Sequence, residues 1–178
     1  MHPIELQSRR EAIGVDILTL AEQLHCAPAT LARYETGAQP IPDTVETTLV
    51  SLEFAFGVVV GLHEEFLVPP DLHTYTSDAG FWRDWPIMTG VPSVIHRAAT
   101  AAVLAIAKHN GIHARIVPAT GQGPVCVQCS TCNGIALALR SDEPGTFIDV
   151  YDQTWRQDHT GTYCPLHQPR HVPTSIDV

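Results

Sequence analysis

The stretch DILTLAEQLHCAPATLARYETG, residues 16–37, decides how the N-terminal part of this chain folds. Asp16 is a residue type that caps helices, and the apolar residues after it recur at helical i, i+3, i+4 and i+7 spacing. These residues are Ile17, Leu20, Ala21 and Leu24. A second helix is predicted from Pro28, because proline suits the first helical position, to Gly37, because glycine ends helices. Two short helices joined by a tight turn predict a helix-turn-helix whose second helix presents its N-terminal half outward.

The same region follows the register of a known family. The motifs R-x-x-I-G-V-D from Arg10, L-A-E-x-L from Leu20 and T-L-x-R-Y-E-x-G from Thr30 occur in that order. On these motifs, residues 10–37 resemble the Cro/C1-type (XRE-like) helix-turn-helix of phage repressors and bacterial regulators. The resemblance implies double-stranded DNA as a partner, and it implies that Arg10 pairs with Glu35. The positions that it implies to be core are Leu20, Ala21, Leu24, Cys26, Leu31 and Tyr34.

The region departs from that family at the turn and on the DNA side. His25 replaces a glycine that has a positive φ in many members. Few side chains of the second helix can read a base by hydrogen bond, so direct readout would rest on Thr30 and Arg33. Arg9 is either a phosphate contact or a solvated surface charge. The expected DNA-contacting residues are therefore Ala27, Pro28, Ala29, Thr30, Arg33 and Arg9.

The charge balance limits how this chain would hold nucleic acid. Its formal net charge is −9, and residues 41–70 hold five acids without a lysine or arginine. Each phosphate neutralised by Lys or Arg steepens the salt dependence of binding. The sequence therefore predicts few such contacts and a shallow salt dependence, with backbone amides at helix N-termini supplying part of the phosphate binding.

Length and composition favour an α+β protein of about three modules. The chain has 178 residues, of which 44% are hydrophobic. The predicted modules are a helix-turn-helix domain at 1–40, a helical linker or dimerisation module at 41–111 and a zinc-ribbon-like β domain at 112–178. The longest apolar run, Phe54–Leu62, has nine residues, fewer than the roughly 18 to 20 needed to cross a bilayer. We expect no membrane partner, a cytoplasmic location and reduced thiols.

A long apolar helix is predicted over residues 43–66. Its apolar residues alternate spacings of four and three, which is a heptad seam about three repeats long. The seam consists of Val45, Leu49, Leu52, Phe56, Val59, His63 and Phe66. A second apolar face beside it consists of Val50, Phe54, Val58 and Leu62. Such a helix is either a spine on which the other modules pack or the contact of a homodimer, and the sequence leaves both open.

Beyond this helix the pattern changes from helical to extended. Residues 67–92 predict a loop with a short helix or edge strand, and an alanine-rich helix follows from Ser93 to Asn110. The period then becomes two residues in four short segments, which predicts a small antiparallel sheet. The segments are 112–117, 124–129, 135–140 and 146–151.

Two hooks of the form Cys-x-x-ligand predict a zinc site in the C-terminal third. Cys129 and Cys132 form the first, which looks like a zinc knuckle, and Cys164 and His167 form the second. Zinc prefers four such ligands in a tetrahedron, so a Cys3His site in a module that resembles a zinc ribbon is expected. Two further residues, Cys126 and His159, stay open as alternative ligands. Four protein ligands leave no open position for catalysis, so the predicted Zn2+ is structural.

Together these patterns predict an N-terminal helix-turn-helix, central helices and a small antiparallel sheet with a Cys3His zinc site. The first functional hypothesis is a sequence-specific DNA-binding transcriptional regulator, repressor-like, with a homodimer through the helix 43–66. The alternative is a protein-interaction adaptor, antitoxin-like or directed against a host factor, in which the helix-turn-helix is architectural. An enzyme is not expected, because no nucleophile–base pair, phosphate loop or open metal site is visible.

Overall fold

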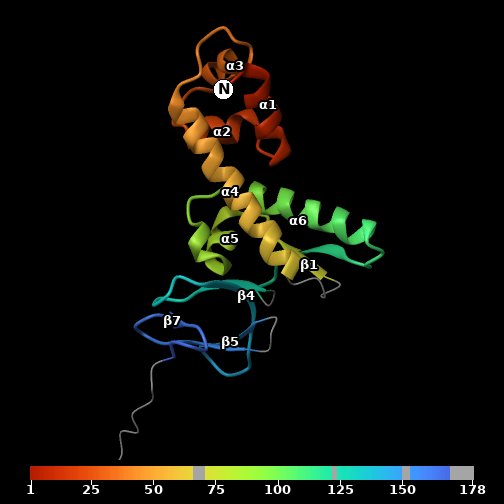
Figure 1. Cartoon of the computed structure of the whole chain (residues 1–178), viewed down its shortest axis with the longest axis vertical. Helices are drawn as coiled ribbons and strands as arrows, with labels where there is room; N and C mark the ends of the chain where they lie inside the picture. The colour runs from red at the N-terminus through yellow and green to blue at the C-terminus, as the bar shows by residue number, and fades with distance from the viewer. Residues whose placement is uncertain (66–70, 122–123, 150–152, 169–178) are drawn as a thin grey trace, which may run out of the picture.

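The computed structural model describes residues 1–65, 71–121, 124–149 and 153–168, and it is a mixed α+β structure (Figure 1). Helices α1 to α3 lie at one end, a five-stranded sheet lies at the other, and α4 runs between them. The helices are α1 (Pro3–Ala12), α2 (Ile17–Gln23), α3 (Pro28–Glu35), α4 (Asp43–Glu65), α5 (Asp78–Asp84), the short 3-10 helix η1 (Pro86–Met88) and α6 (Ser93–His109). The strands are β1 (Asp71–Thr74), β2 (Arg115–Pro118), β3 (Val125–Gln128), β4 (Ile135–Arg140), β5 (Thr146–Asp149), β6 (Thr154–Gln157) and β7 (Thr162–Tyr163).

Local signals set the bounds of the first helices. The carboxylate of Asp16 accepts the Thr19 backbone N–H at 2.7 Å, which caps α2 as predicted. Pro28 occupies the first position of α3, and Gly37 follows that helix at φ +74°. His25 holds the left-handed conformation expected of the turn, at φ +50°. We call residues 1–40 the head below.

An ion pair and a small apolar core hold the head together. Arg10 is buried, and its Nε donates to Glu35 Oε1 at 2.7 Å, as the resemblance implied. Its Nη1 also donates to the carbonyl oxygen of Val15 at 2.7 Å. The buried apolar residues of the head are Leu6, Ile13, Val15, Leu20, Ala21 and Leu31. Because Arg10 on α1 is bound both to Glu35 on α3 and to the Val15 carbonyl, this buried ion pair fixes the spacing of α1 and α3.

Gly14 is one of the points at which the head contacts the rest of the chain, beside the Arg9–Glu53 pair between α1 and α4. Gly14 has φ +73°, and a Cβ placed on it would lie 2.6 Å from the Cβ of Ala98 on α6. Real Cβ atoms do not approach that closely. A side chain at position 14 would therefore be strained in its backbone and would also collide with α6.

Helix α4 is a spine within the chain. Its predicted seam is buried at Val45, Leu49, Leu52, Val59 and His63, while Phe56 is half-buried and Phe66 lies outside the described residues. Because this seam packs against other parts of the same chain, it is not free to pair with a second copy. By length and hydropathy Asp43–His63 could cross a membrane, and 33% of its most apolar window is buried inside the chain.

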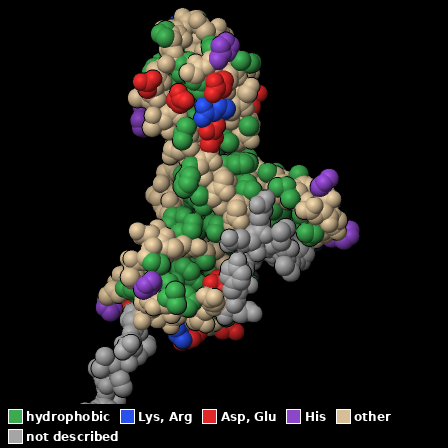
Figure 2. All heavy atoms as spheres, viewed as in Figure 1, with side chains coloured by type: hydrophobic (Ala, Val, Ile, Leu, Met, Phe, Trp, Pro, Cys, Tyr) green, Lys and Arg blue, Asp and Glu red, His purple; other side chains and the backbone are tan. Residues whose placement is uncertain are grey.

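The second face of α4 is exposed over its first half, and Val58 farther along is half-buried against the core. Val50 is 49% exposed and Phe54 is 73% exposed, whereas Leu62 is buried. A Cβ added at Gly57 or Gly61 would meet nothing within 4 Å. Figure 2 shows hydrophobic side chains gathered along the middle of the molecule, where α4 and α6 run.

The strands form two sheets instead of the one predicted. β1 and β2 pair in parallel, with Leu72 opposite Ile116, and α6 lies in the connection between them. A parallel pair needs such a crossover, so residues 112–117 were wrongly assigned to the antiparallel sheet. That sheet runs β3-β4-β5-β6-β7, antiparallel throughout, and includes two strands, β6 and β7, that the period-two pattern missed.

The two faces of the five-stranded sheet belong to different apolar clusters. Cys126 and Leu137 join the large cluster that also contains the helices. The second cluster is smaller and includes two of the predicted metal ligands. It consists of Val125, Val127, Cys129, Ala138, Phe147, Trp155 and Cys164. The part of the sheet that surrounds these cysteines therefore has little apolar core of its own.

Candidate metal centre

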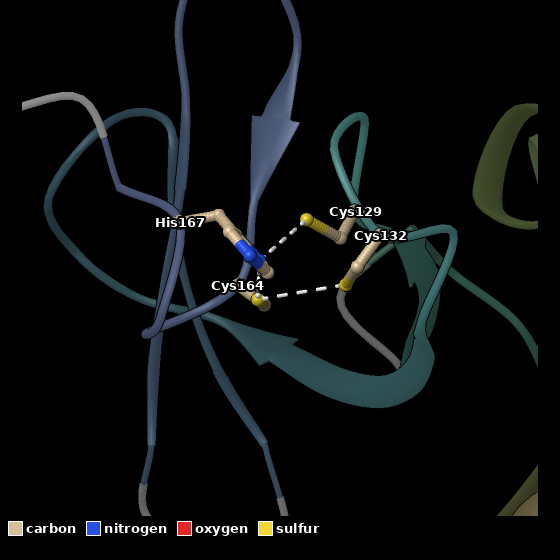
Figure 3. Close-up of side chains that lie close together, drawn as sticks. All are labelled: Cys129, Cys132, Cys164 and His167. Atoms are coloured by element: carbon tan, nitrogen blue, oxygen red, sulfur yellow. Dashed lines mark hydrogen bonds between the residues drawn. The ribbon is translucent and has the colours of Figure 1, made fainter.

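Four side chains from the two hooks point toward one another at the end of the sheet (Figure 3). Cys129 and Cys132 flank the turn between β3 and β4, while Cys164 and His167 follow β7. One ligand atom from each residue lies within 4.8 Å of all the others. Cys132 Sγ is 3.9 Å from Cys164 Sγ, and His167 Nδ1 is 3.8 Å from Cys129 Sγ and 3.1 Å from Cys164 Sγ.

These distances fit a tetrahedral metal ion. With Zn–S of about 2.3 Å and Zn–N of about 2.0 Å, the edges of a zinc tetrahedron are about 3.8 Å between sulfurs and about 3.6 Å between sulfur and nitrogen. The separations between 3.1 and 3.9 Å bracket those values. Three sulfurs and one imidazole nitrogen are also the donor set of a structural zinc site. The four residues could therefore hold a metal ion with little rearrangement.

Backbone hydrogen bonds shape the first hook. The Cys129 N–H donates to Gly134 O at 2.8 Å, and the Asn133 N–H donates to Cys129 O at 3.0 Å. The residue with positive φ is Asn133, at +58°, a residue type that tolerates this conformation. The role of Gly134 is to leave space for a sulfur, because a Cβ there would lie 3.3 Å from Cys132 Sγ.

The second hook is tied to the first through β7. The Ser130 N–H donates to Thr162 O at 2.8 Å, and the Thr162 N–H donates to Ser130 Oγ at 3.1 Å. Within the second hook, the His167 N–H donates to Cys164 O at 2.9 Å. The sheet thus brings together two hooks that lie more than thirty residues apart in the chain.

The surroundings favour one thiolate in the absence of metal. Burial opposes ionisation of Cys129, but N–H donors of Cys164, Cys132 and Thr131 outweigh it and lower its pKa to about 5. Burial raises the pKa of the Cys164 thiol, and the neighbouring Cys129 and Cys132 raise it further. Because a metal binds cysteine as thiolate, loading this site would release protons from the thiols.

Neither alternative ligand joins the four. Cys126 is 3% exposed and lies in the apolar cluster with the helices, where burial raises its pKa to about 12. His159 is exposed in the turn between β6 and β7, and it is not a member of the cluster of ligand atoms. The geometry therefore favours Cys129, Cys132, Cys164 and His167.

The residues expected to contact DNA lie at the surface, with one difference. Ala27, Pro28, Ala29 and Arg33 are exposed, and Thr30 is half-buried. Arg9 is bound within the chain, because its Nε and Nη2 each donate to a Glu53 carboxylate oxygen at 2.7 Å. Glu5 and Glu46 also lie within 4.0 Å of its guanidinium. We therefore leave Arg9 out of the DNA-facing set.

A cleft between the helices and the sheet was not predicted. It has a volume of about 360 Å3, and Arg83, Asp84 and Arg140 line part of it. Asp84 and Arg140 are 56 residues apart. Only the packing of α5 on the sheet brings them together, so no local pattern in the sequence could have indicated the cleft.

No protein-family model matches this chain, and a search of curated proteins found no match either.

Proposed function

We propose that this chain is a sequence-specific DNA-binding transcriptional regulator whose C-terminal sheet is stabilised by zinc. The observation that carries the proposal is the exposed outer edge of α3. Ala27, Pro28 and Ala29 are exposed there, while Leu31 on the opposite side of the helix is buried in the head. In a helix-turn-helix, the edge that enters the major groove is the N-terminal half of the second helix.

The N-terminus of α3 is suited to a phosphate. Ala27 provides no side-chain cap, and the first turn holds no acidic residue. An uncapped helix N-terminus offers backbone N–H groups to an anion. Here Pro28 has no N–H and the Thr30 N–H donates to Ala27 O at 2.8 Å, which leaves that role to Ala29. Arg33 is exposed, and its side chain makes no ion pair within the described ranges of the chain. The acidic residue nearest in sequence, Glu35, is already bound by Arg10.

We further propose that Zn2+ occupies the Cys3His cluster in a structural role. The purified chain should carry about one zinc, and Cys132→Ser should lose it because the tetrahedron then lacks a thiolate. Cys126→Ala is the matched control, since Cys126 lies in the other apolar cluster, and it should retain the metal. Metal analysis by mass spectrometry decides this. Zinc far below one per chain in the wild type would contradict the proposal.

Dimerisation and a cytoplasmic location belong to the same proposal. The exposed residues Thr47, Val50, Phe54, Gly57 and Gly61 on α4 keep spacings of three and four. Phe54 projects from this face, and the two glycines leave open space on it, so a second copy can supply a matching surface. A two-fold pair would present two α3 helices to paired half-sites.

The test of DNA binding is selection of bound fragments from random duplex DNA. The wild-type chain should enrich a motif, and Arg33→Ala should lose the enrichment because its guanidinium is the one free cation expected on α3. Arg115→Ala is the control, since Arg115 lies on β2 and is paired with Asp71. Absence of enrichment at modest salt, or equal enrichment by Arg33→Ala, would overturn the proposal.

The second candidate is a protein-interaction adaptor that uses the head architecturally. The exposed Val50 and Phe54 favour it, since contiguous apolar surface marks contact sites. The selection experiment distinguishes the DNA-binding regulator from the adaptor. An adaptor would give no enriched motif with either the wild type or Arg33→Ala.

A further inference from the structure

The cleft between the helices and the sheet has the size and lining of a small-molecule site. Its volume of about 360 Å3 lies in the range of ligand pockets, which often form where two packed units meet. Helix α5 and η1 form one wall, and strands of the five-stranded sheet form the other. The lining residues used below are Arg83, Ile87, Gln128, Arg140, Phe147 and Gln157.

Positive charge is concentrated at this cleft. The chain holds only ten lysines and arginines against nineteen acids, yet two of its arginines line the same cleft. Between them lies Asp84, which is 3% exposed. Arg83 donates to both of its carboxylate oxygens at 2.9 Å, and Arg140 Nη2 donates to one at 3.2 Å.

The Asp84 carboxylate stays ionised and is enclosed by its partners. Burial opposes ionisation, but the hydrogen bonds and charges of Arg83 and Arg140 outweigh it and lower the pKa of Asp84. Two guanidiniums and one carboxylate leave a local charge of +1. Because the carboxylate is bound by both arginines, the net charge that the cleft offers a ligand is positive.

The cleft also offers donors without partners. Nε and Nη1 of Arg140 and the side-chain amides of Gln128 and Gln157 make no hydrogen bond to any part of the chain that the structure describes. Phe147 lines the cleft with only 6% of its surface exposed, and the Arg140 guanidinium lies over its ring at 5.8 Å from the centroid. Ile87 adds to the apolar lining from η1. The free N–H donors and the net positive charge suit an acidic group on a ligand, and the apolar lining beside them suits a planar apolar part.

We propose that this cleft binds a small organic anion, with its carboxylate or phosphate on the free N–H groups of Arg140 and its apolar part against Phe147 and Ile87. The proposal does not depend on DNA binding. Its occupant would contact both α5–η1 and the sheet, since residues of each line the cleft.

Calorimetric titration of the full, metal-loaded chain with phenyl phosphate tests the proposal. Saturable binding is expected, and Arg140→Gln should weaken it about tenfold, the usual effect of losing one charge-assisted hydrogen bond. Arg140→Lys should recover part of the affinity because it keeps the charge. Arg115→Gln, an exposed arginine on β2 outside the cleft, is the matched control and should bind as the wild type does.

Two further compounds, benzoate and benzyl alcohol, test what the cleft requires of its ligand. Benzoate binding beside phenyl phosphate identifies the shared requirement as a single acidic group, whereas binding of phenyl phosphate alone identifies a phosphate site. Benzyl alcohol, which lacks charge, should not bind. Equal affinity for benzyl alcohol, no saturation at millimolar phenyl phosphate, or undiminished affinity in a folded Arg140→Gln variant would overturn the proposal. Thermal unfolding of each variant establishes that it is folded.

Discussion

Arg9 and Arg10 are neighbours in sequence but have different surroundings. Arg10 points into the head, where its side chain is 7% exposed and pairs with Glu35 at 8%. Arg9 points toward α4, where its side chain is 24% exposed and pairs with Glu53 at 30%. Both arginines have a raised pKa because a glutamate accepts hydrogen bonds from the guanidinium. The two pairs differ in burial, and burial decides how much each pair contributes to the stability of the fold.

Removing the charge of Arg10 should cost far more stability than removing that of Arg9. Arg10→Gln leaves Glu35 buried without a cation, which costs about 3 kcal/mol of unfolding free energy. Arg9→Gln removes a pair nearer the surface, which is worth about 1 kcal/mol or less. Urea denaturation of the two variants measures both values. Equal losses would show that the Arg10–Glu35 pair is not the stronger contact.

Single residues were predictable where their effect is local. Asp16 and Pro28 act on backbone within a few positions, so residue type and spacing were sufficient to place the cap and the helix start, whereas the left-handed turn at His25 was expected from the family resemblance. The four residues of the candidate metal centre were predictable because each hook carries two of them close together. The partners of Asp84 were not, since Arg140 comes from a distant strand.

The faces of α4 lead to a prediction about association. Phe54→Glu should abolish self-association, because a carboxylate on the exposed face would be buried against a second copy. It should leave folding unchanged, since Phe54 is 73% exposed within the chain. Light scattering after size exclusion gives the mass. Ile4→Glu, at a 60% exposed position on α1, is the control. A wild type that is monomeric at all concentrations would contradict the dimer.

Histidines between α4 and α6 should make stability fall in acid. His63 and His96 are buried with ring centroids 5.5 Å apart, and burial lowers the pKa of both. The unfolded chain therefore binds protons near pH 6.5 that the folded chain does not. These two histidines therefore leave stability unchanged well above pH 6.5 and decrease it as pH falls below 6.5, His96 more than His63 because its pKa is lowered further.

Comparing His96→Leu with the wild type isolates this effect. His96 Nε2 is buried without a hydrogen-bond partner in the described structure, so a protonated ring there would be poorly solvated. The variant should lose less stability than the wild type when urea denaturation is repeated from pH 7.5 to pH 5.5. Protonation of the metal ligands affects both chains equally, so only the difference is interpreted. Identical pH dependence would show that His96 titrates normally in the folded chain.

At the scale of elements, length and periodicity predicted the helices better than the strands. The bounds of α4 and α6 agree closely with the predicted ranges. Strand pairing depends on partners far apart in sequence, and the alternation in residues 112–117 could not reveal that β2 pairs with β1. β6 and β7 are short and carry little period-two alternation, so they were missed.

Across the whole molecule, metal removal should affect the two ends differently. The cluster around Cys129 and Cys164 is small, so a bound metal would supply a large part of its stability, whereas the helices share the larger apolar cluster. Chelation should expose β3–β7 to hydrogen exchange while α1–α4 remain protected. Exchange mass spectrometry with and without chelator measures this. Equal protection of the sheet in both samples would mean that it folds without metal.

The absence of a side chain at Gly14 has a consequence for dissecting this protein. The turn between α1 and α2 rests on Ala98 with room for hydrogen alone. Enlarging this one position would push the turn between α1 and α2 off α6, while α1 would remain paired with α4 through Arg9 and Glu53. Whether the N-terminal piece works only when held at a set angle by its neighbour can thus be asked by adding a single methyl group.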